Sequence, residues 1–356
     1  MPTAQLNTQG TVIFYHDSGP PKNCAVYTTV VLVHGFAING GIFERMLPHA
    51  ATYGFRIIAM NSRDYSGSTP YTPDELSDYT SHNLDKQAAA VRRWAHEIGC
   101  FLVHVCSSLR IPRARALPRG QIGGLIMVAW SLSTMAALAM LGDARSLGEE
   151  LSSQLALYLR KVILYDPSSR TAGVHPDLLL TWPVADPTIP PEEKPAKFNE
   201  WVSSYFTAHP DDAPITVEAL HARTALPRTP TLLKLTSAEL HRVTNPEILL
   251  RSGLIVNTDS SIHLRHARTT FSDADAVLPR VEVIVWWCDC TFWMALWGAK
   301  VFAEFIKEEP SAGKRKRSAS MLKLKDANHF LHWEEPERMV RLLAEACHGS
   351  MSLARL

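Results

Sequence analysis

Apolar residues along the chain form two kinds of pattern that alternate from one end to the other: short apolar runs typical of buried strands, and apolar residues repeated at helical spacing. Residues 27–36, "YTTVVLVHGF", form an almost continuous apolar run, which is typical of a strand buried on both faces of a parallel sheet. Residues 84–109 repeat apolar side chains at helical spacing instead, with Ala88, Val91 and Trp94 on one face. The predicted strands are 11–15, 27–36, 55–63, 123–130, 161–167, 281–287 and 321–327, and further helices are predicted over 41–54 and 335–349.

This alternation predicts the α/β class, with a doubly wound and mostly parallel sheet. One block, 170–275, breaks the alternation: it contains the proline-rich "WPVADPTIPPEEKP" and several helical stretches. We interpret it as a helical lid inserted after the strand at 161–167, within a core formed by 1–169 and 276–356. A chain of 356 residues is long enough for one large core with such an insertion.

Composition narrows the possible partners. Hydrophobic residues make up 46% and charged residues 20% of the chain, and the net charge of +1 gives no overall field that would attract nucleic acid or an anionic membrane.

Residues 120–141 carry no charge, but their β-rich first half and Ala/Leu/Met-rich second half indicate a strand, a tight turn and a buried helix. We therefore expect no integral membrane segment. The first twenty residues lack an apolar segment, so no secretory signal is expected.

The six cysteines are scattered, which is typical of free thiols in a reducing compartment. Cys288 and Cys290 form a C-x-C pair without a second Cys/His cluster nearby, so neither a metal site nor a cofactor is expected. The basic run "KRKR" at 314–317 is expected to be a solvated loop.

Three polar residues follow predicted strands: Ser131, Asp289 and His329. The carboxyl ends of parallel strands lie on one edge of a sheet, where ligands bind. The order Ser, Asp, His is that of the α/β-hydrolases. The stretches "VVLVHGF", "NSRDYSGST", "VAWSLST" and "ANHFLHWEEPE" appear in the order found in that superfamily. The chain therefore resembles a lid-bearing, esterase-like α/β-hydrolase over roughly 11–169 and 280–345.

The resemblance implies a nucleophile on a sharp turn with the pattern G-x-S-x-G. Here Ala129 and Ser133 replace the two glycines, and both are small. Ser133 is the weaker nucleophile candidate, because its own flank would be the bulky Met135. The resemblance thus makes Ser131 the nucleophile, which would form an acyl-enzyme. The alternative is a decayed site in which Ser131 only caps a helix.

The remaining machinery also follows from the resemblance. His329 would be the general base, and Asp289 is favoured as the acid that orients it. Asp166, at the end of the preceding predicted strand, is the alternative acid. The oxyanion hole would consist of the backbone N–H groups of Phe36 and Leu132.

Seven of the nine tryptophans come after residue 180, which favours an aromatic, apolar pocket. Trp130, Trp201, Phe206 and Trp287 are its candidate lining residues. We expect a cofactor-free serine hydrolase that acts on an uncharged small-molecule ester, thioester or lactone with a hydrophobic acyl part. A lyase or C–C bond hydrolase on the same scaffold is the second reading, and a non-catalytic binding protein is the third.

The last three residues, Ala354, Arg355 and Leu356, have the small, basic, apolar character of a C-terminal peroxisomal import signal. We therefore favour the peroxisomal matrix, reached through an import receptor, over the cytoplasm.

Overall fold

The computed structural model describes residues 2–117, 120–175 and 181–348. Its centre is an eight-stranded sheet with the order β1-β2-β4-β3-β7-β8-β9-β10. The six strands from β4 to β10 in that order are parallel, while β2 is antiparallel to β4 and β1 is antiparallel to β2. This confirms the predicted α/β class. The strands are β1 (Thr3–Gln5), β2 (Val12–Asp17), β3 (Thr28–Val33), β4 (Phe55–Met60), β7 (Leu125–Trp130), β8 (Leu159–Tyr165), β9 (Glu282–Cys288) and β10 (Ala319–Leu324).

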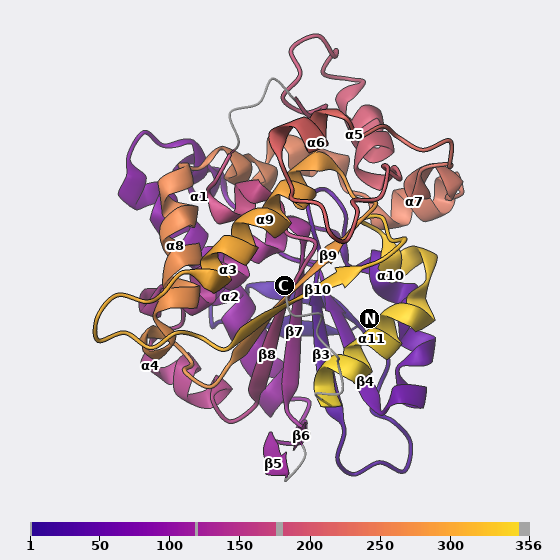
Figure 1. The fold of residues 1–356 in the computed structure, drawn as a ribbon. Coiled ribbons are helices and arrows are strands. Elements are labelled where there is room, and N and C mark those ends of the chain that lie inside the picture. The colour runs from indigo at the N-terminus through magenta and orange to yellow at the C-terminus, as the bar shows by residue number, and fades with distance from the viewer. Residues whose placement is uncertain (1, 118–119, 176–180, 349–356) are drawn as a thin grey trace.

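The central strands are apolar because helices cover both faces of the sheet (Figure 1). Every residue of β3, β4 and β7 is buried. One face carries α2 (Leu84–Ser107), α3 (Thr134–Gly142), α4 (Ala144–Leu155), α8 (Ser260–Ser272) and α9 (Trp293–Lys307), and the other carries η1 (Gly40–His49), α10 (Leu331–Glu334) and α11 (Pro336–His348).

The helical predictions hold for α2 and α11, but the segment 41–54 differs. It forms the 3₁₀ helices η1 and η2 (Ala51–Tyr53), with Pro48 inside η1. Proline removes a backbone donor and disfavours a regular α-helix, which accounts for the tighter and less regular turns.

The apolar run at 120–141 divides as expected into β7 and the wholly buried helix α3. Within the residues described, no helix is long and apolar enough to cross a membrane.

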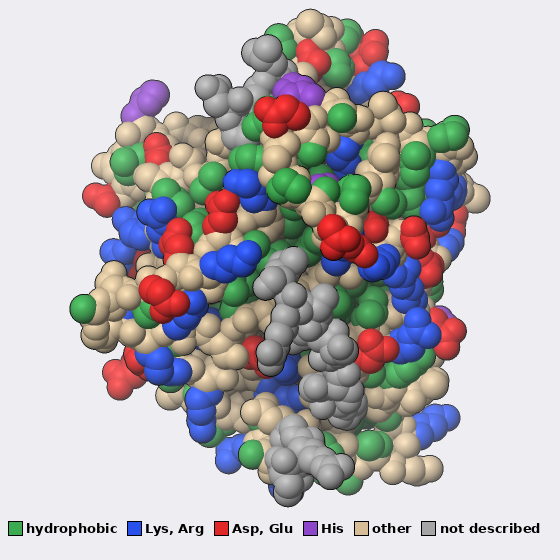
Figure 2. All heavy atoms as spheres, in the orientation of Figure 1, with side chains coloured by type: hydrophobic (Ala, Val, Ile, Leu, Met, Phe, Trp, Pro, Cys, Tyr) green, Lys and Arg blue, Asp and Glu red, His purple; other side chains and the backbone are tan. Residues whose placement is uncertain are grey.

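The basic run 314–317 lies largely at the surface, as expected, except for its last residue. Arg317 is buried and donates to backbone carbonyls that include those of Thr270 (2.8 Å) and Val277 (2.7 Å). Lys314 and Arg315 pair with nearby aspartates. Elsewhere, acidic and basic side chains are interspersed over the face shown in Figure 2, in keeping with the small net charge.

The block 170–275 lies largely over the end of the sheet where the parallel strands finish (Figure 1). Its last helix, α8, packs on α3, and Thr270 Oγ1 donates to the carbonyl of Leu138 at 3.0 Å. The boundaries 170 and 275 remain a prediction. The other elements of the block are η5 (Ser169–Ala172), α5 (Lys194–Ser203), α6 (Val217–His221), η6 (Thr231–Lys234), α7 (Ser237–Val243), η7 (Pro246–Leu250) and η8 (Ser252–Asn257).

Candidate active site

Ser131 lies on a sharp turn between β7 and α3. Its φ is +56°, a left-handed conformation that is uncommon for a residue with a side chain. A side chain on Gly35 would not fit here, because a Cβ at that position would lie 2.9 Å from the Cβ of Ser131. The turn therefore leaves Ser131 partly exposed at the tip of the strand, although Trp130 before it and Ser133 after it are buried.

Ser133 has a different role. It is fully buried, and its Oγ lies 3.0 Å from the carbonyl oxygens of both Val33 and Trp130, between which it shares its one proton. These bonds attach the turn to the end of β3. Ser133 thus fills the position of a small packing residue, as the sequence pattern suggested.

His329 follows β10 and contacts a carboxylate. Its Nδ1 lies 2.5 Å from Oδ2 of Asp166, and both side chains are buried. The same carboxylate accepts from the hydroxyl of Thr291 at 2.6 Å and from the backbone N–H of Cys288 at 2.9 Å. With three donors aimed at it, Asp166 can hold one orientation of the His329 ring.

The structure therefore corrects the preferred carboxylate, since Asp166 and not Asp289 lies beside His329. Asp166 is one residue beyond β8, and its φ of +47° accompanies a carboxylate turned across the end of β9. Asp289 is buried, and its Oδ1 accepts from the N–H of Ala327 at 3.3 Å. Asp289 thus holds the start of the loop that carries His329.

The inserted block also fixes this loop. Asn328 is buried and donates through Nδ2 to the carbonyl of Ser203 and to Oγ1 of Thr231, each at 2.8 Å. Glu334, on α10, accepts from the same Thr231 hydroxyl at 2.7 Å and from Lys234 at 2.6 Å. The position of His329 consequently depends on α5 and η6 as well as on the sheet.

The loop after β3 is shaped by His34. Its Nε2 accepts from the N–H of Ser62 at 2.9 Å, so its Nδ1 carries the proton and donates to the carbonyl of Gly35 at 3.0 Å. Burial lowers the pKa of His34 to about 4, which keeps the ring neutral near pH 7. Tyr65 supports the same loop by accepting from the N–H of Ala37 at 3.1 Å.

The two predicted oxyanion donors lie beside Ser131. Phe36 and Leu132 line the same cavity as the serine. Leu132 is the second residue of the short helix η4 (Ser131–Ser133), where a backbone N–H has no acceptor within the helix. Within the described part of the chain, neither N–H donates a hydrogen bond. Both groups are thus available to a ligand atom.

The cavity at Ser131 opens to solvent and encloses about 410 Å³ including that open space, and aromatic and aliphatic side chains form most of its lining. Aromatic contacts run along the cavity wall from the loop after β3 to His329. The ring centre of Phe36 lies 5.4 Å from that of Phe198, Trp201 lies 4.6 Å from Phe292, and Phe292 lies 4.9 Å from His329. The lining residues are Phe36, Ser131, Leu132, Ser168, Arg170, Trp182, Phe198, Trp201, Val202, Val256, Phe292 and Met294.

Of the four aromatic residues predicted to form the pocket, Trp201 alone lines this cavity. Trp130 packs in the core against His329 and His332, at 4.9 and 4.5 Å between ring centres. Phe206 and Trp287 do not line it either; Trp287 lies in a separate groove. Sequence reasoning missed Phe292 as a lining residue, although its position four residues after the end of β9 could have indicated it.

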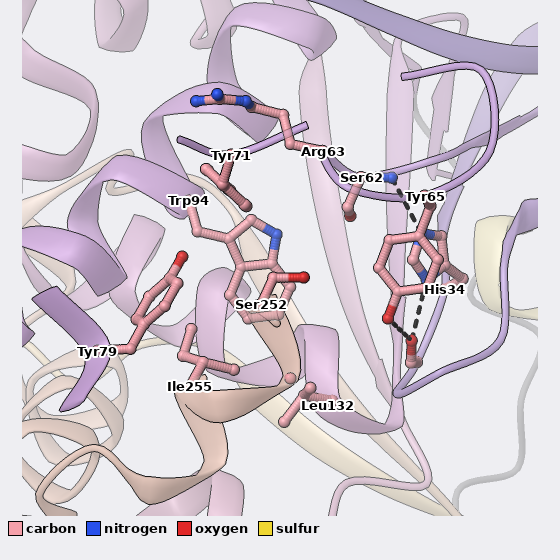
Figure 3. A pocket seen from close by; sticks show the side chains of 12 residues that line it. His34, Ser62, Arg63, Tyr65, Tyr71, Tyr79, Trp94, Leu132, Ser252 and Ile255 are labelled. Atoms are coloured by element: carbon pink, nitrogen blue, oxygen red, sulfur yellow. Dashed lines mark hydrogen bonds between the residues drawn. The ribbon is translucent and has the colours of Figure 1, made fainter. Parts of the chain in front are cut away.

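A second cavity, which encloses about 350 Å³ including space open to solvent, is lined in part by His34 and Gly35 of the loop after β3 (Figure 3). Tyr71, Tyr79 and Trp94 face His34 and Tyr65 across it. Leu132 lines both cavities, so the turn after Ser131 has space on two sides.

The six cysteines are all free thiols. Among the described residues, no group of three or more His, Cys, Asp or Glu side chains could hold a metal ion.

Comparison with known proteins identifies the family. A sequence model described as the alpha/beta hydrolase family matches residues 30–342. The chain belongs to this family. No curated protein matches it.

Solved structures of other alpha/beta hydrolase-like chains share the fold at low identity. A serine hydrolase from the polyaromatic-hydrocarbon-degrading bacterium Cycloclasticus zankles is 12% identical with a TM-score of 0.57, covering 99% of each chain. An epoxide hydrolase from Vigna radiata is 13% identical (TM-score 0.53, covering 97% of this chain and 96% of that one). The thioesterase domain of the curacin biosynthetic pathway is also 13% identical (TM-score 0.51, 96% and 99%). These likenesses show the fold alone.

Proposed function

We propose that the chain is a serine hydrolase that cleaves a carboxylic ester, thioester or lactone with a hydrophobic acyl part. The observation that carries the proposal is Ser131, held in a left-handed turn at the edge of an apolar cavity. A serine or other L-residue adopts this backbone only where the surrounding structure enforces it, and such positions cluster at functional sites. Asp166 follows β8 and His329 follows β10, on either side of β9, and the two side chains meet at the same end of the sheet.

The proposed reaction has two steps. Ser131 Oγ attacks the acyl carbon while His329 Nε2 takes its proton, and that proton then passes to the departing alcohol or thiol. Water repeats the sequence on the acyl-enzyme and releases the acid. The N–H groups of Phe36 and Leu132 stabilise the oxyanion in both steps, and Asp166 stabilises the protonated ring.

A fluorophosphonate probe with mass mapping tests the nucleophile. We expect labelling at Ser131, loss of labelling in Ser131→Ala, and retained labelling in Ser133→Ala. Turnover of short p-nitrophenyl esters then tests the reaction class. Absence of labelling in the folded protein would favour a non-catalytic binding function, and labelling without ester turnover would favour a lyase or C–C bond hydrolase.

We also propose that the enzyme is imported into peroxisomes through Ala354, Arg355 and Leu356, which lie outside the described residues. A fluorescent protein fused to the N-terminus should give puncta that coincide with a peroxisomal marker. The same fusion without 354–356 should be diffuse. A diffuse signal with the tail intact would place the enzyme in the cytosol.

A further inference from the structure

Arg170 gives the candidate active site a charge that the sequence did not predict. Among the described residues that line the Ser131 cavity, it is the one charged side chain, and the others are mostly aromatic or aliphatic. Its guanidinium lies 5.7 Å from the ring centre of Trp182. An isolated cation in an apolar cavity is costly unless something balances it.

The guanidinium is only partly used by the protein. Nη1 donates to the carbonyl of Val256 at 3.0 Å. Nε is buried and has no hydrogen-bond partner, and within the described residues Nη2 makes neither a hydrogen bond nor an ion pair. Among the described residues Nη2 is therefore left without a partner, whereas Nε is enclosed by the protein.

Two other arginines in this chain show what the Nε and Nη2 groups of a guanidinium bind. Arg56 holds the carboxylate of Asp17 through Nε at 3.0 Å and Nη2 at 2.5 Å. Arg145 holds Asp143 in the same way, at 3.0 and 2.8 Å. The two parallel N–H groups match the two oxygens of a carboxylate. Arg170 carries the same guanidinium, and no carboxylate of the described residues pairs with it.

The backbone that carries Arg170 is tightly packed. A Cβ on Gly298 of α9 would lie 2.2 Å from the carbonyl oxygen of Pro167, so helix and loop are in direct backbone contact. Gly173 ends η5 with a φ of +69° and lies equally close to the backbone of α8. Arg170 thus comes from a fixed segment four residues beyond Asp166.

We propose that Arg170 binds a carboxylate carried by the substrate, so that the preferred substrate is an ester, thioester or lactone whose apolar part also bears a free carboxylate. A half-ester of a dicarboxylic acid is the simplest example. This inference rests on the proposed hydrolase function and replaces the uncharged substrate expected from the sequence. The aromatic wall would hold the carbon chain between the reacting carbonyl at Ser131 and the carboxylate at Arg170.

The test compares matched substrates. Mono-p-nitrophenyl esters of dicarboxylic acids of increasing length are assayed beside the same compounds with the free acid capped as a methyl ester. We expect the full-length enzyme to prefer the free acid at one chain length. Arg170→Gln should reduce the acid-to-capped ratio of kcat/KM by about tenfold or more, mainly through KM. Arg170→Lys, which keeps the charge without the fork, should be intermediate.

Arg268→Gln is the matched control, because it removes an exposed arginine of α8. It should leave the ratio at the wild-type value. An unchanged ratio in folded Arg170→Gln would overturn the inference, and so would an equal fall in Arg268→Gln.

A separate measurement keeps this test independent of catalysis. Calorimetric binding of an unreactive dicarboxylate such as suberate to Ser131→Ala should weaken when Arg170→Gln is added. If no p-nitrophenyl ester is turned over but this difference is seen, the proposed function fails and the carboxylate site stands. Equal binding with and without Arg170 would overturn the site.

Discussion

At the scale of single residues, the two serines of "AWSLST" differ in backbone conformation and in burial. Ser131 is strained and partly exposed, while Ser133 is buried and bonded to two carbonyls. Ser131→Ala should therefore lower kcat for a p-nitrophenyl ester by about 10³-fold or more with the fold intact. Ser133→Ala should keep most activity and lower stability by about 1 kcal/mol, because it removes a buried hydrogen-bonding hydroxyl. Steady-state kinetics and urea unfolding of both variants check this; an active Ser131→Ala would contradict it.

The acid gives a second residue-scale prediction. Asp166→Asn should reduce kcat by about 10²- to 10⁴-fold with little change in KM, because tautomer control acts on the chemical step. Asp289→Asn should act mainly on stability, since its carboxylate holds the N–H of Ala327. Steady-state kinetics and thermal unfolding of the two variants distinguish a catalytic role from a structural one. A larger loss of kcat in Asp289→Asn than in Asp166→Asn would show that Asp289 is the acid.

These residues also show what sequence can and cannot supply. Ser131 and His329 were predicted from motif and order, because each follows an apolar strand within a stretch that resembles the family pattern. The choice between Asp166 and Asp289 could not be made this way, since both stand at strand ends. It depends on a left-handed φ at Asp166 and on the hydroxyl of Thr291, which only the folded chain reveals.

At the scale of elements, the strand and helix pattern predicted the core because burial imposes periods of 2 and 3.6 on it. The insertion was less predictable. Its short helices make contacts with the His329 loop that no local period encodes, such as the bonds of Asn328 to Ser203 and Thr231. The same reason explains why the pocket residues were mostly misjudged: an aromatic residue has the same local pattern whether it faces a cavity or the core.

The inserted elements carry a prediction about chain length. Trp201 of α5 lines the Ser131 cavity, whereas Phe206, five residues on, does not. Trp201→Ala should enlarge the cavity and shift the preferred acyl chain to longer esters, with a smaller effect on acetate. Phe206→Ala is the matched control and should leave the preference unchanged. An ester series from acetate to decanoate measures it, and equal losses on all chain lengths in Trp201→Ala would indicate core packing instead.

At the scale of the whole molecule, burial of several histidines links stability to pH. Burial lowers the pKa of His34 to about 4 and of His263 to about 3, and that of His332 falls well below its usual value. In the unfolded chain each titrates near 6.5. Between the two values the unfolded state binds more protons, so stability is full above about pH 6.5 and falls as the pH drops toward the folded pKa.

The expected loss can be measured with one substitution. Each of these histidines should lower the free energy of unfolding by about 2 kcal/mol when the pH falls from 7 to 5. Partial burial would raise the pKa of Glu75, but hydrogen bonds from Arg63 lower it to about 2. Its effect on stability therefore appears below about pH 4.5, outside the range from pH 7 to pH 5. In urea unfolding, His263→Gln should reduce the difference in unfolding free energy between pH 7 and pH 5 by about 2 kcal/mol. His82→Gln, at an exposed position, should retain the wild-type difference. A wild-type protein equally stable at pH 5 and pH 7 would show that these side chains are not held neutral in the folded chain.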